Sequence, residues 1–306
     1  MAKEKTSYTA LMVDIVSSRM IPAGLRIDVQ KRLIALIDTL NKLFVSGIEQ
    51  KLTLSGGDEV QGLFTESGDA FTAGRLLQIG LYPVLVRVGI GKGGWTIRTP
   101  GEPSTFQDGT AYHYAREAMA DLRGRQDATG PQFNEENERR MNVSNTLART
   151  VFAWTREQTE AQREVSMIYE VDNLFAHSQL AATDASAINA FLREARLWRR
   201  RFLSRRPLFD EAMQYVQALP PNLRKASLAK TAFDKQELYA VEKAWPHVPH
   251  FSLASIADII GGDSPITEQA ISQRRVAGHV DLVIDLDEAW VKLQEITVEE
   301  DSCSCS

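Results

Sequence analysis

The chain has 306 residues, of which 43% are hydrophobic and 25% charged, and its formal net charge is −5 at pH 7. This is a globular composition on a length that usually divides into two domains. The negative charge excludes a protein that coats nucleic acid by bulk attraction. No apolar run approaches the roughly 18 residues of a membrane span, so we expect a cytoplasmic protein without membrane contact.

The first part of the chain alternates between strand-like and helix-like patterns. The expected elements are a strand over Tyr8–Val13, a helix over Leu25–Phe44, strands over Ile48–Leu54 and Val60–Phe64, a helix over Ser67–Leu81, a strand over Val84–Ile90 and a helix over Ala111–Leu122. Gly56 and Gly57 suit the positive φ angles of a tight hairpin turn between the second and third strands. The order predicts an α+β domain over residues 1–125, with functional groups on loops at the strand ends.

The rest of the chain is expected to be helical. Gly124–Asn137 has the composition of a loop and marks the boundary of a second region, residues 138–298. Helical patterns cover Asn145–Glu170 and Ala187–Phe202. Residues 299–306 are polar and hold both cysteines of the chain, so we expect a disordered tail there.

Two aspartates stand where strands are expected to end. Asp14 follows the first strand, and Asp58 lies at the tip of the hairpin. Carboxylates on adjacent strands can hold divalent cations that bridge the oxygens of a triphosphate. The loop Ile15–Arg19 supplies backbone N–H groups ahead of a helix, which is a favourable place for phosphate. Taken singly, each aspartate could equally be an ordinary cap or turn residue.

The ordered set of motifs resembles two families of nucleotide cyclases. Val13–Ser18 and Gly57-Asp58 resemble the two metal-binding stretches of class III adenylate and guanylate cyclases. Gly56–Val60 is also similar to the hairpin of GGDEF-type diguanylate cyclases, with a valine in place of the aromatic residue. Val86–Gly91 resembles the next cyclase strand, and Gly109–Arg116 the helix that carries a transition-state arginine. Both families have a ferredoxin-like palm, so the resemblance implies a palm-type nucleotide-binding domain.

The chain is also similar, over nearly its whole length, to the SatD family of bacterial proteins, which joins such a palm to a C-terminal helix-turn-helix. The similar stretches are Asp14–Arg19, the Gly-Asp-Glu hairpin, Gly89–Gly91 and Ala111–Ala118. The segment Asn173–Ala232 is longer than the family pattern leads us to expect, which leaves its role open.

The resemblance implies roles for particular residues. Asp14 and Asp58 would hold Mg²⁺ or Mn²⁺, with a nucleoside triphosphate as ligand or substrate. The implied nucleotide-contacting positions are Ile15, Val16, Ser17, Ser18, Gly56 and Gly57. Arg116 would face phosphate, unless it is a plain surface arginine, and Glu59 would bind metal or act on a proton. Tyr112 stands where cyclases place an asparagine, and a phenol cannot reproduce the donor and acceptor pair of an amide.

A helix-turn-helix pattern covers residues 252–278. Ser252–Ile260 has the spacing of a short helix, Gly261–Pro265 that of a turn, and Ile266–Val276 that of a polar, basic helix suited to the major groove. The side chains suited to contact double-stranded DNA are Gln269, Ser272, Gln273, Arg274 and Arg275. Two short helices around a glycine turn also occur without DNA, and the family resemblance favours DNA binding.

Seven arginines lie in the expected helix Arg193–Arg206. They could grip a phosphate backbone, or they could form a solvated face whose stems cover Trp198 and Phe202, and we favour the second interpretation.

Two functions remain open from the sequence. The favoured one is a DNA-binding regulatory protein whose palm binds a nucleotide through Mg²⁺. The alternative is an active nucleotidyl cyclase or related nucleotidyltransferase that uses two-metal catalysis. A homodimer is expected from the resemblance alone.

Overall fold

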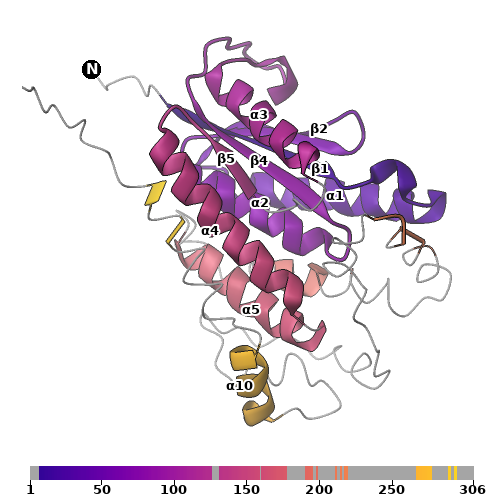
Figure 1. The fold of residues 1–306 in the computed structure, drawn as a ribbon. Coiled ribbons are helices and arrows are strands. Elements are labelled where there is room, and N and C mark those ends of the chain that lie inside the picture. Colours follow the sequence, from indigo (N-terminus) through magenta and orange to yellow (C-terminus); the bar gives the residue numbers. More distant parts are fainter. Residues whose placement is uncertain are drawn as a thin grey trace, which may run out of the picture.

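A mixed five-stranded sheet with the strand order β2-β3-β1-β4-β5 organises the chain (Figure 1). The computed structural model describes residues 7–125, 131–158, 160–177, 190–195 and 267–277, with a few single positions between 198 and 294. The strands are β1 Tyr8–Ile15, β2 Ile48–Ser55, β3 Glu59–Phe64, β4 Val86–Gly93 and β5 Pro131–Asn134. The helices are α1 Ala23–Leu43, α2 Ser67–Leu81, α3 Thr110–Gly124, α4 Glu138–Glu157, α5 Glu160–His177 and α10 Glu268–Ala277.

The central strand β1 pairs antiparallel with both β3 and β4 and is buried along its whole length. Leu11, Val13 and Ile15 belong to the large core cluster under α1 and α2, while Ala10 and Met12 belong to a smaller cluster under α3. Helices therefore cover both faces of the sheet (Figure 1). A strand that is buried on both faces has a nearly continuous apolar sequence, which is why the pattern of β1 was easy to recognise.

Helix α3 lies unusually close to β4 because glycines on that strand leave room for it. A Cβ atom added to Gly91 would come within 2.2 Å of backbone atoms of Ala111 and Ala115 in α3. The strand expected to end at Ile90 therefore runs on through Gly91 to Gly93 as part of β4. The close approach fixes the helix against the strand that flanks β1.

The α+β character and the first seven elements agree with the expectation, and the differences begin after α3. The segment Gly124–Asn137, expected as a linker, contains β5, which pairs parallel with β4. The side chain of Asn145 in α4 accepts from the Phe133 N–H at 2.7 Å and donates to its carbonyl at 2.8 Å. The Asn145 side chain thus satisfies the backbone N–H and carbonyl of Phe133 at the edge of the sheet, as a neighbouring strand would. These bonds help a strand of only four residues to form.

The helix expected over Asn145–Glu170 is two helices, α4 and α5. The chain turns at Gln158, whose backbone is extended and whose buried amide donates to Ser166 Oγ at 3.2 Å. A side chain that hydrogen-bonds across the break compensates for the interrupted helical ladder.

The helical region shares its core with the sheet. Trp290 stacks on Phe71 of α2, with ring centroids 4.1 Å apart and planes 13° apart, and meets Phe133 of β5 edge-on. Arg75 of α2 forms a 2.7 Å ion pair with Glu170 of α5, and both side chains are buried. The core cluster under α1 and α2 therefore continues into the helical region. Within the described residues, no helix is long and apolar enough to cross a membrane.

Candidate functional site

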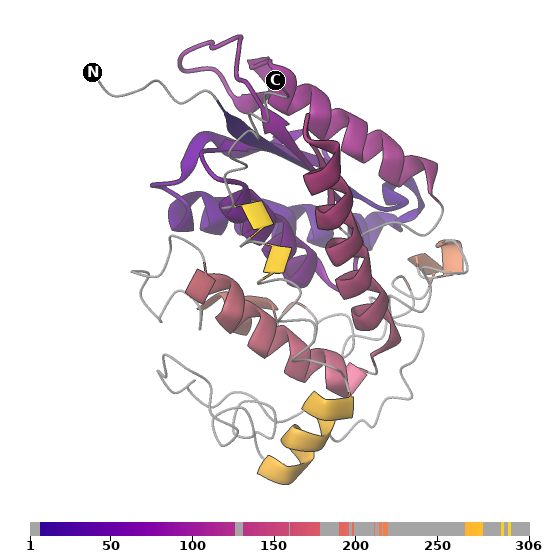
Figure 2. The same ribbon diagram turned by 60° about the vertical axis from the view of Figure 1, so that its left-hand side comes forward.

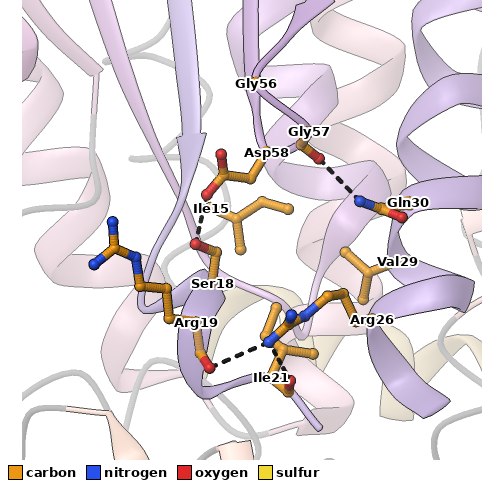
Figure 3. A pocket seen from close by; sticks show the side chains of 10 residues that line it. All are labelled: Ile15, Ser18, Arg19, Ile21, Arg26, Val29, Gln30, Gly56, Gly57 and Asp58. Carbon is orange, nitrogen blue, oxygen red and sulfur yellow. Dashed lines mark hydrogen bonds between the residues drawn. The ribbon is translucent and has the colours of Figure 1, made fainter. Parts of the chain in front are cut away.

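A pocket of about 310 Å³ opens between the loop after β1, the first half of α1 and the β2–β3 turn (Figure 3). Its lining residues are Ile15, Ser18, Arg19, Ile21, Arg26, Val29, Gln30, Gly56, Gly57 and Asp58. Five of the residues that the sequence analysis named for nucleotide or metal thus line one pocket. Val16 is fully buried behind it, and Ser17 is not among its lining residues.

The β2–β3 turn has a backbone that requires glycine. Gly56 and Gly57 have φ angles of 64° and 91°, which L side chains rarely adopt. The turn is held from both sides, because Gln30 of α1 donates to the Gly57 carbonyl at 3.4 Å and the Ile15 N–H donates to the Asp58 carbonyl at 3.3 Å. The hairpin tip and the end of β1 are therefore fixed relative to one another.

The loop after β1 turns sharply at Ser17. Its φ of 52° makes it the sole non-glycine residue with positive φ in the described part of the chain. Such residues gather at functional sites, where the surrounding structure holds them. The turn places Ser18 so that its hydroxyl donates to Asp58 Oδ2 at 2.5 Å (Figure 3). One oxygen of Asp58 is thereby oriented within the pocket.

Tyr215 of the helical region supports the same loop from behind. Its buried hydroxyl donates to the Val16 carbonyl at 3.0 Å and accepts from the Leu85 N–H at 3.3 Å. Burial raises the pKa of Tyr215 far above its usual value, so the phenol is neutral and can donate. Tyr215, about 200 positions further along the chain than Val16, thus hydrogen-bonds to the loop after β1.

Asp14 is not among the lining residues of the pocket and lies in a cluster of ionised side chains that includes Arg123 of α3. Its register partners are Glu59 on β3 and Arg87 on β4. Asp14 Oδ1 accepts from Arg87 Nη1 at 3.3 Å, and Oδ2 accepts from Arg123 Nε at 2.9 Å. Arg123 Nη2 also reaches Glu59 Oε2 at 3.2 Å. One guanidinium of α3 therefore bridges two carboxylates of adjacent strands.

Arg123 is the functional candidate that sequence reasoning missed. Burial lowers its pKa, but the carboxylates of Asp14 and Glu59 outweigh that effect and raise it. In the sequence it is a basic residue in the last turn of a helix, where cations are common because they complement the helix dipole. Its position two helical turns after Arg116 was the available signal, because residues at that spacing share a helix face.

The structure gives the two predicted metal-binding aspartates separate partners. Asp58 is bound by Ser18, whereas Asp14 is bound by Arg87 and Arg123, and it is Glu59 that shares a cationic group with Asp14. No group of three or more His, Cys, Asp or Glu side chains is placed to hold a metal among the described residues. The Asp14–Glu59 pair nevertheless fits a cation, because the Arg123 guanidinium already occupies a point within reach of both carboxylates.

The SatD family model matches residues 8–197, well over half of the chain. The chain belongs to the SatD family. No curated protein matches it. Among solved structures, a bacterial light-regulated adenylyl cyclase is similar to it, with a TM-score of 0.32 and 18% identity over 42% of this chain and 76% of the cyclase chain. A TM-score of this size does not establish a shared fold.

Arg116 of this SatD protein points to a different neighbourhood from the Asp14 cluster. It lies within 3.4 Å of Asp108 Oδ1 and of His113 Nδ1. Tyr112, expected to replace a cyclase asparagine, is fully buried and within hydrogen-bonding distance of Ser104 Oγ at 3.0 Å. Burial raises the pKa of Tyr112 to about 12. The structure therefore does not bring these two residues to Asp14 and Glu59.

The second helix of the expected helix-turn-helix is α10, which packs against α5 (Figure 2). Ile271 is buried in the core, Gln269 and Gln273 are exposed, and Ser272 and Arg274 are half-buried. Arg275 belongs to the helix, but its side chain lies outside the described residues, as do the first helix and the turn of the pattern, residues 252–266, and the tail, residues 299–306.

The arginine-rich segment of the SatD protein is described at a few positions. Arg193 is exposed, whereas Trp198 is buried and donates from Nε1 to the Leu81 carbonyl at 3.2 Å. The segment from residue 199 to 206 lies outside the described residues. Trp198 thus anchors this helix to the end of α2.

Proposed function

We propose that this SatD-family protein is a DNA-binding regulator whose N-terminal domain binds a nucleoside triphosphate with Mg²⁺ or Mn²⁺. The observation that carries the proposal is the pocket between the loop after β1 and the β2–β3 turn, which is lined by Asp58 and two arginines. Asp14 and Glu59 are register partners at the adjoining ends of β1 and β3. The strands and helices up to β4 follow the order βαββαβ with β1 in the centre, which is the order expected of a ferredoxin-like palm.

The pocket has the chemistry of a phosphate site. Arg19 and Arg26 line it, and a guanidinium offers five N–H donors in a planar fork that suits phosphate oxygens. Arg26 Nη2 donates to the carbonyls of Arg19 and Ile21, which orients its side chain along the pocket wall (Figure 3). Ser18 adds a hydroxyl beside Asp58.

Asp14 and Glu59, with Asp58 nearby in the chain, are the residues that would hold the divalent cation. Such a cation would supply positive charge that neutralises the oxygens of a triphosphate. The chain itself orients these acids: Ser18 holds Asp58, and Arg87 holds Asp14.

Binding without turnover is the better supported role for the nucleotide. Transition-state stabilisation needs positioned donors in addition to the metals. Tyr112 is buried against Ser104, and Arg116 contacts Asp108 and His113, so neither adds a donor to the Asp14 cluster within one chain. A nucleotidyl cyclase or nucleotidyltransferase is the second candidate, because Asp14, Asp58 and Glu59 provide carboxylates at the ends of adjacent strands.

The DNA-binding half of the proposal is supported by α10. One side of this helix is anchored by buried Ile271, and Gln269 and Gln273 are exposed on it. Glutamine side chains can pair with base edges or phosphates. Binding to double-stranded DNA should weaken steeply with salt and should weaken further in Arg274→Ala and Arg275→Ala. Fluorescence anisotropy with labelled duplex at several salt concentrations measures this, and unchanged binding in both variants would refute the assignment.

The nucleotide half is tested by thermal melting of the full-length protein with each common nucleoside triphosphate, with Mg²⁺ or with EDTA. A ligand at 100 times its Kd stabilises the fold by about 2.7 kcal/mol, so the melting temperature should rise only when metal is present. Asp58→Asn should abolish the rise, while Asp38→Asn, which changes an exposed acid on α1, should keep it.

Chromatography of the same mixtures separates regulator from enzyme. We expect no cyclic or linked nucleotide product. A product that forms in the native protein and disappears in Asp14→Asn would make the protein an enzyme. A melting temperature that no nucleotide changes would refute both functions.

A further inference from the structure

The side chain of Arg123 occupies the place where Asp14 and Glu59 come together. Arg123 Nη2 lies 2.8 Å from Asp14 Oδ2 and 3.2 Å from Glu59 Oε2. The two acids are register partners on adjacent antiparallel strands, so their side chains leave the sheet on the same face. A group that touches both carboxylates must sit at the position of this guanidinium.

The charges of the cluster balance without a metal ion. Asp14 and Glu59 carry two negative charges, and Arg87 and Arg123 carry two positive charges. A divalent cation bound to the same oxygens would stand within a few ångströms of the Arg123 guanidinium and would be repelled by it. The cation and Arg123 in its present position are therefore mutually exclusive.

Of the two arginines, Arg123 is the one that can leave. Its side chain is 51% exposed and extends from the last turn of α3, whereas that of Arg87 is 19% exposed on β4, next to the central strand. Movement of Arg123 into solvent requires no change in the core.

We propose that Arg123 and a divalent cation are alternative occupants of the Asp14–Glu59 pair, so that Arg123 sets the affinity of this site for metal. The inference rests on the proposed metal-assisted binding of a nucleotide. Arg123 keeps the two acids paired and oriented in the metal-free protein. A bare cation must displace the arginine and leaves it without a partner. A cation that arrives with a triphosphate brings negative charge, which supplies the displaced arginine with a new anionic partner. Arg123 thereby makes the site respond to the metal–nucleotide complex in preference to free metal.

A purely structural role for Arg123 makes a different prediction. If the arginine only ties the end of α3 to the sheet, its removal lowers the melting temperature and leaves metal affinity unchanged. The two roles are separated by measuring metal binding directly.

The experiment titrates full-length protein with Mn²⁺ in the absence of nucleotide and follows free Mn²⁺ by electron paramagnetic resonance. Arg123→Ala should bind Mn²⁺ at least about tenfold more tightly than the native protein, because a positive charge next to the metal has been removed. Arg123→Lys keeps the charge and should remain close to the native affinity. Arg139→Ala, which removes an exposed arginine at the start of α4, is the matched control and should leave the affinity unchanged. Asp14→Asn should abolish the tight binding of Arg123→Ala.

An affinity of Arg123→Ala that equals or falls below the native value would overturn the proposal, as would identical affinities in Arg123→Ala and Arg123→Lys. Melting with ATP and Mg²⁺ keeps this failure distinct from failure of the proposed function. If the native protein shows the metal-dependent melting shift while Arg123→Ala has native Mn²⁺ affinity, Arg123 only holds the end of α3 to the sheet. The proposal that the protein binds a nucleotide is then retained. If neither protein binds Mn²⁺ and neither shows the shift, both proposals are wrong.

Discussion

Replacing Tyr215 with phenylalanine removes one hydroxyl group from between two backbone groups of the sheet. The hydroxyl donates to the Val16 carbonyl and accepts from the Leu85 N–H, and Tyr215 is almost fully buried. The Val16 N–H also donates to the Leu85 carbonyl at 2.9 Å, so the phenol closes a hydrogen-bonded ring at the ends of β1 and β4. Phenylalanine fills the same volume and leaves both groups without this partner.

The expected cost follows from those two groups. A buried donor or acceptor that loses its partner costs about 1–3 kcal/mol, and the mutation also removes the cost of burying the hydroxyl itself. We expect the free energy of unfolding to fall by about 2–4 kcal/mol. For a chain of this size, each kcal/mol corresponds to roughly 2 °C, so the melting temperature should fall by about 4–8 °C.

Thermal melting followed by circular dichroism measures the change. Tyr112→Phe is the matched control, because that tyrosine is also fully buried but contacts one side-chain oxygen, that of Ser104. It should lose about 1 kcal/mol. Tyr215→Phe should also weaken the metal-dependent melting shift with nucleotide, because Val16 belongs to the loop beside the pocket. A Tyr215→Phe melting temperature within about 1 °C of the native value would refute the reasoning, since that is below the roughly 2 °C expected for even 1 kcal/mol.

Two further substitutions test how the helices are held on the sheet. Glu170→Gln should cost about 3–5 kcal/mol, because it removes the carboxylate that pairs with a buried arginine of α2. Burial raises the pKa of Glu170, but two neighbouring arginines outweigh burial and hold it below its usual value of 4.5, so this stability is present above pH 4.5 and is lost as pH falls below it. Native protein should therefore lose melting temperature more steeply on acidification than Glu170→Gln, and parallel pH profiles would contradict this. Gly91→Ala should cost about 1–3 kcal/mol in urea unfolding because its Cβ would overlap α3, whereas Gly124→Ala, with open space around it, should be nearly neutral.

The elements that the sequence predicted are those with a complete local signal. The apolar run of β1, the period of α1 and the Gly-Gly turn are each readable within a few residues. Strand β5 has no such signal, because it has four residues and depends on the side chain of Asn145 for its outer hydrogen bonds. The break at Gln158 depends in the same way on Ser166. A strand or a helix break that depends on one side chain from another element leaves no periodic signal in its own sequence, so it was not predicted.

In the candidate site, too, the residues with a local sequence signal were predicted and those contributed by distant elements were not. The pocket residues around Asp58 are near one another in the predicted order of elements, so motif spacing was enough to collect them. Arg123 comes from α3 and Tyr215 from the helical region. Whether their side chains contact Asp14 and Val16 depends on how these elements pack on the sheet, which the sequence pattern does not specify. Arg116 and Arg123 are both arginines on α3, and periodicity alone could not tell which one meets Asp14.

The wide separation in sequence between the pocket loop and its supports has a consequence for synthesis of the protein. Val16 finds its hydrogen-bond partner at position 215, and Phe71 finds its stacking partner at position 290. Ribosomes add about 5–20 residues per second, so roughly 8–33 s separate completion of residue 125 from arrival of Trp290. During that interval Phe71 of α2 has no stacking partner, and the Val16 carbonyl lacks the Tyr215 hydroxyl until position 215 has been added. The loop after β1 therefore acquires its hydrogen bond from Tyr215 only after the chain has been extended well beyond the sheet that carries this loop.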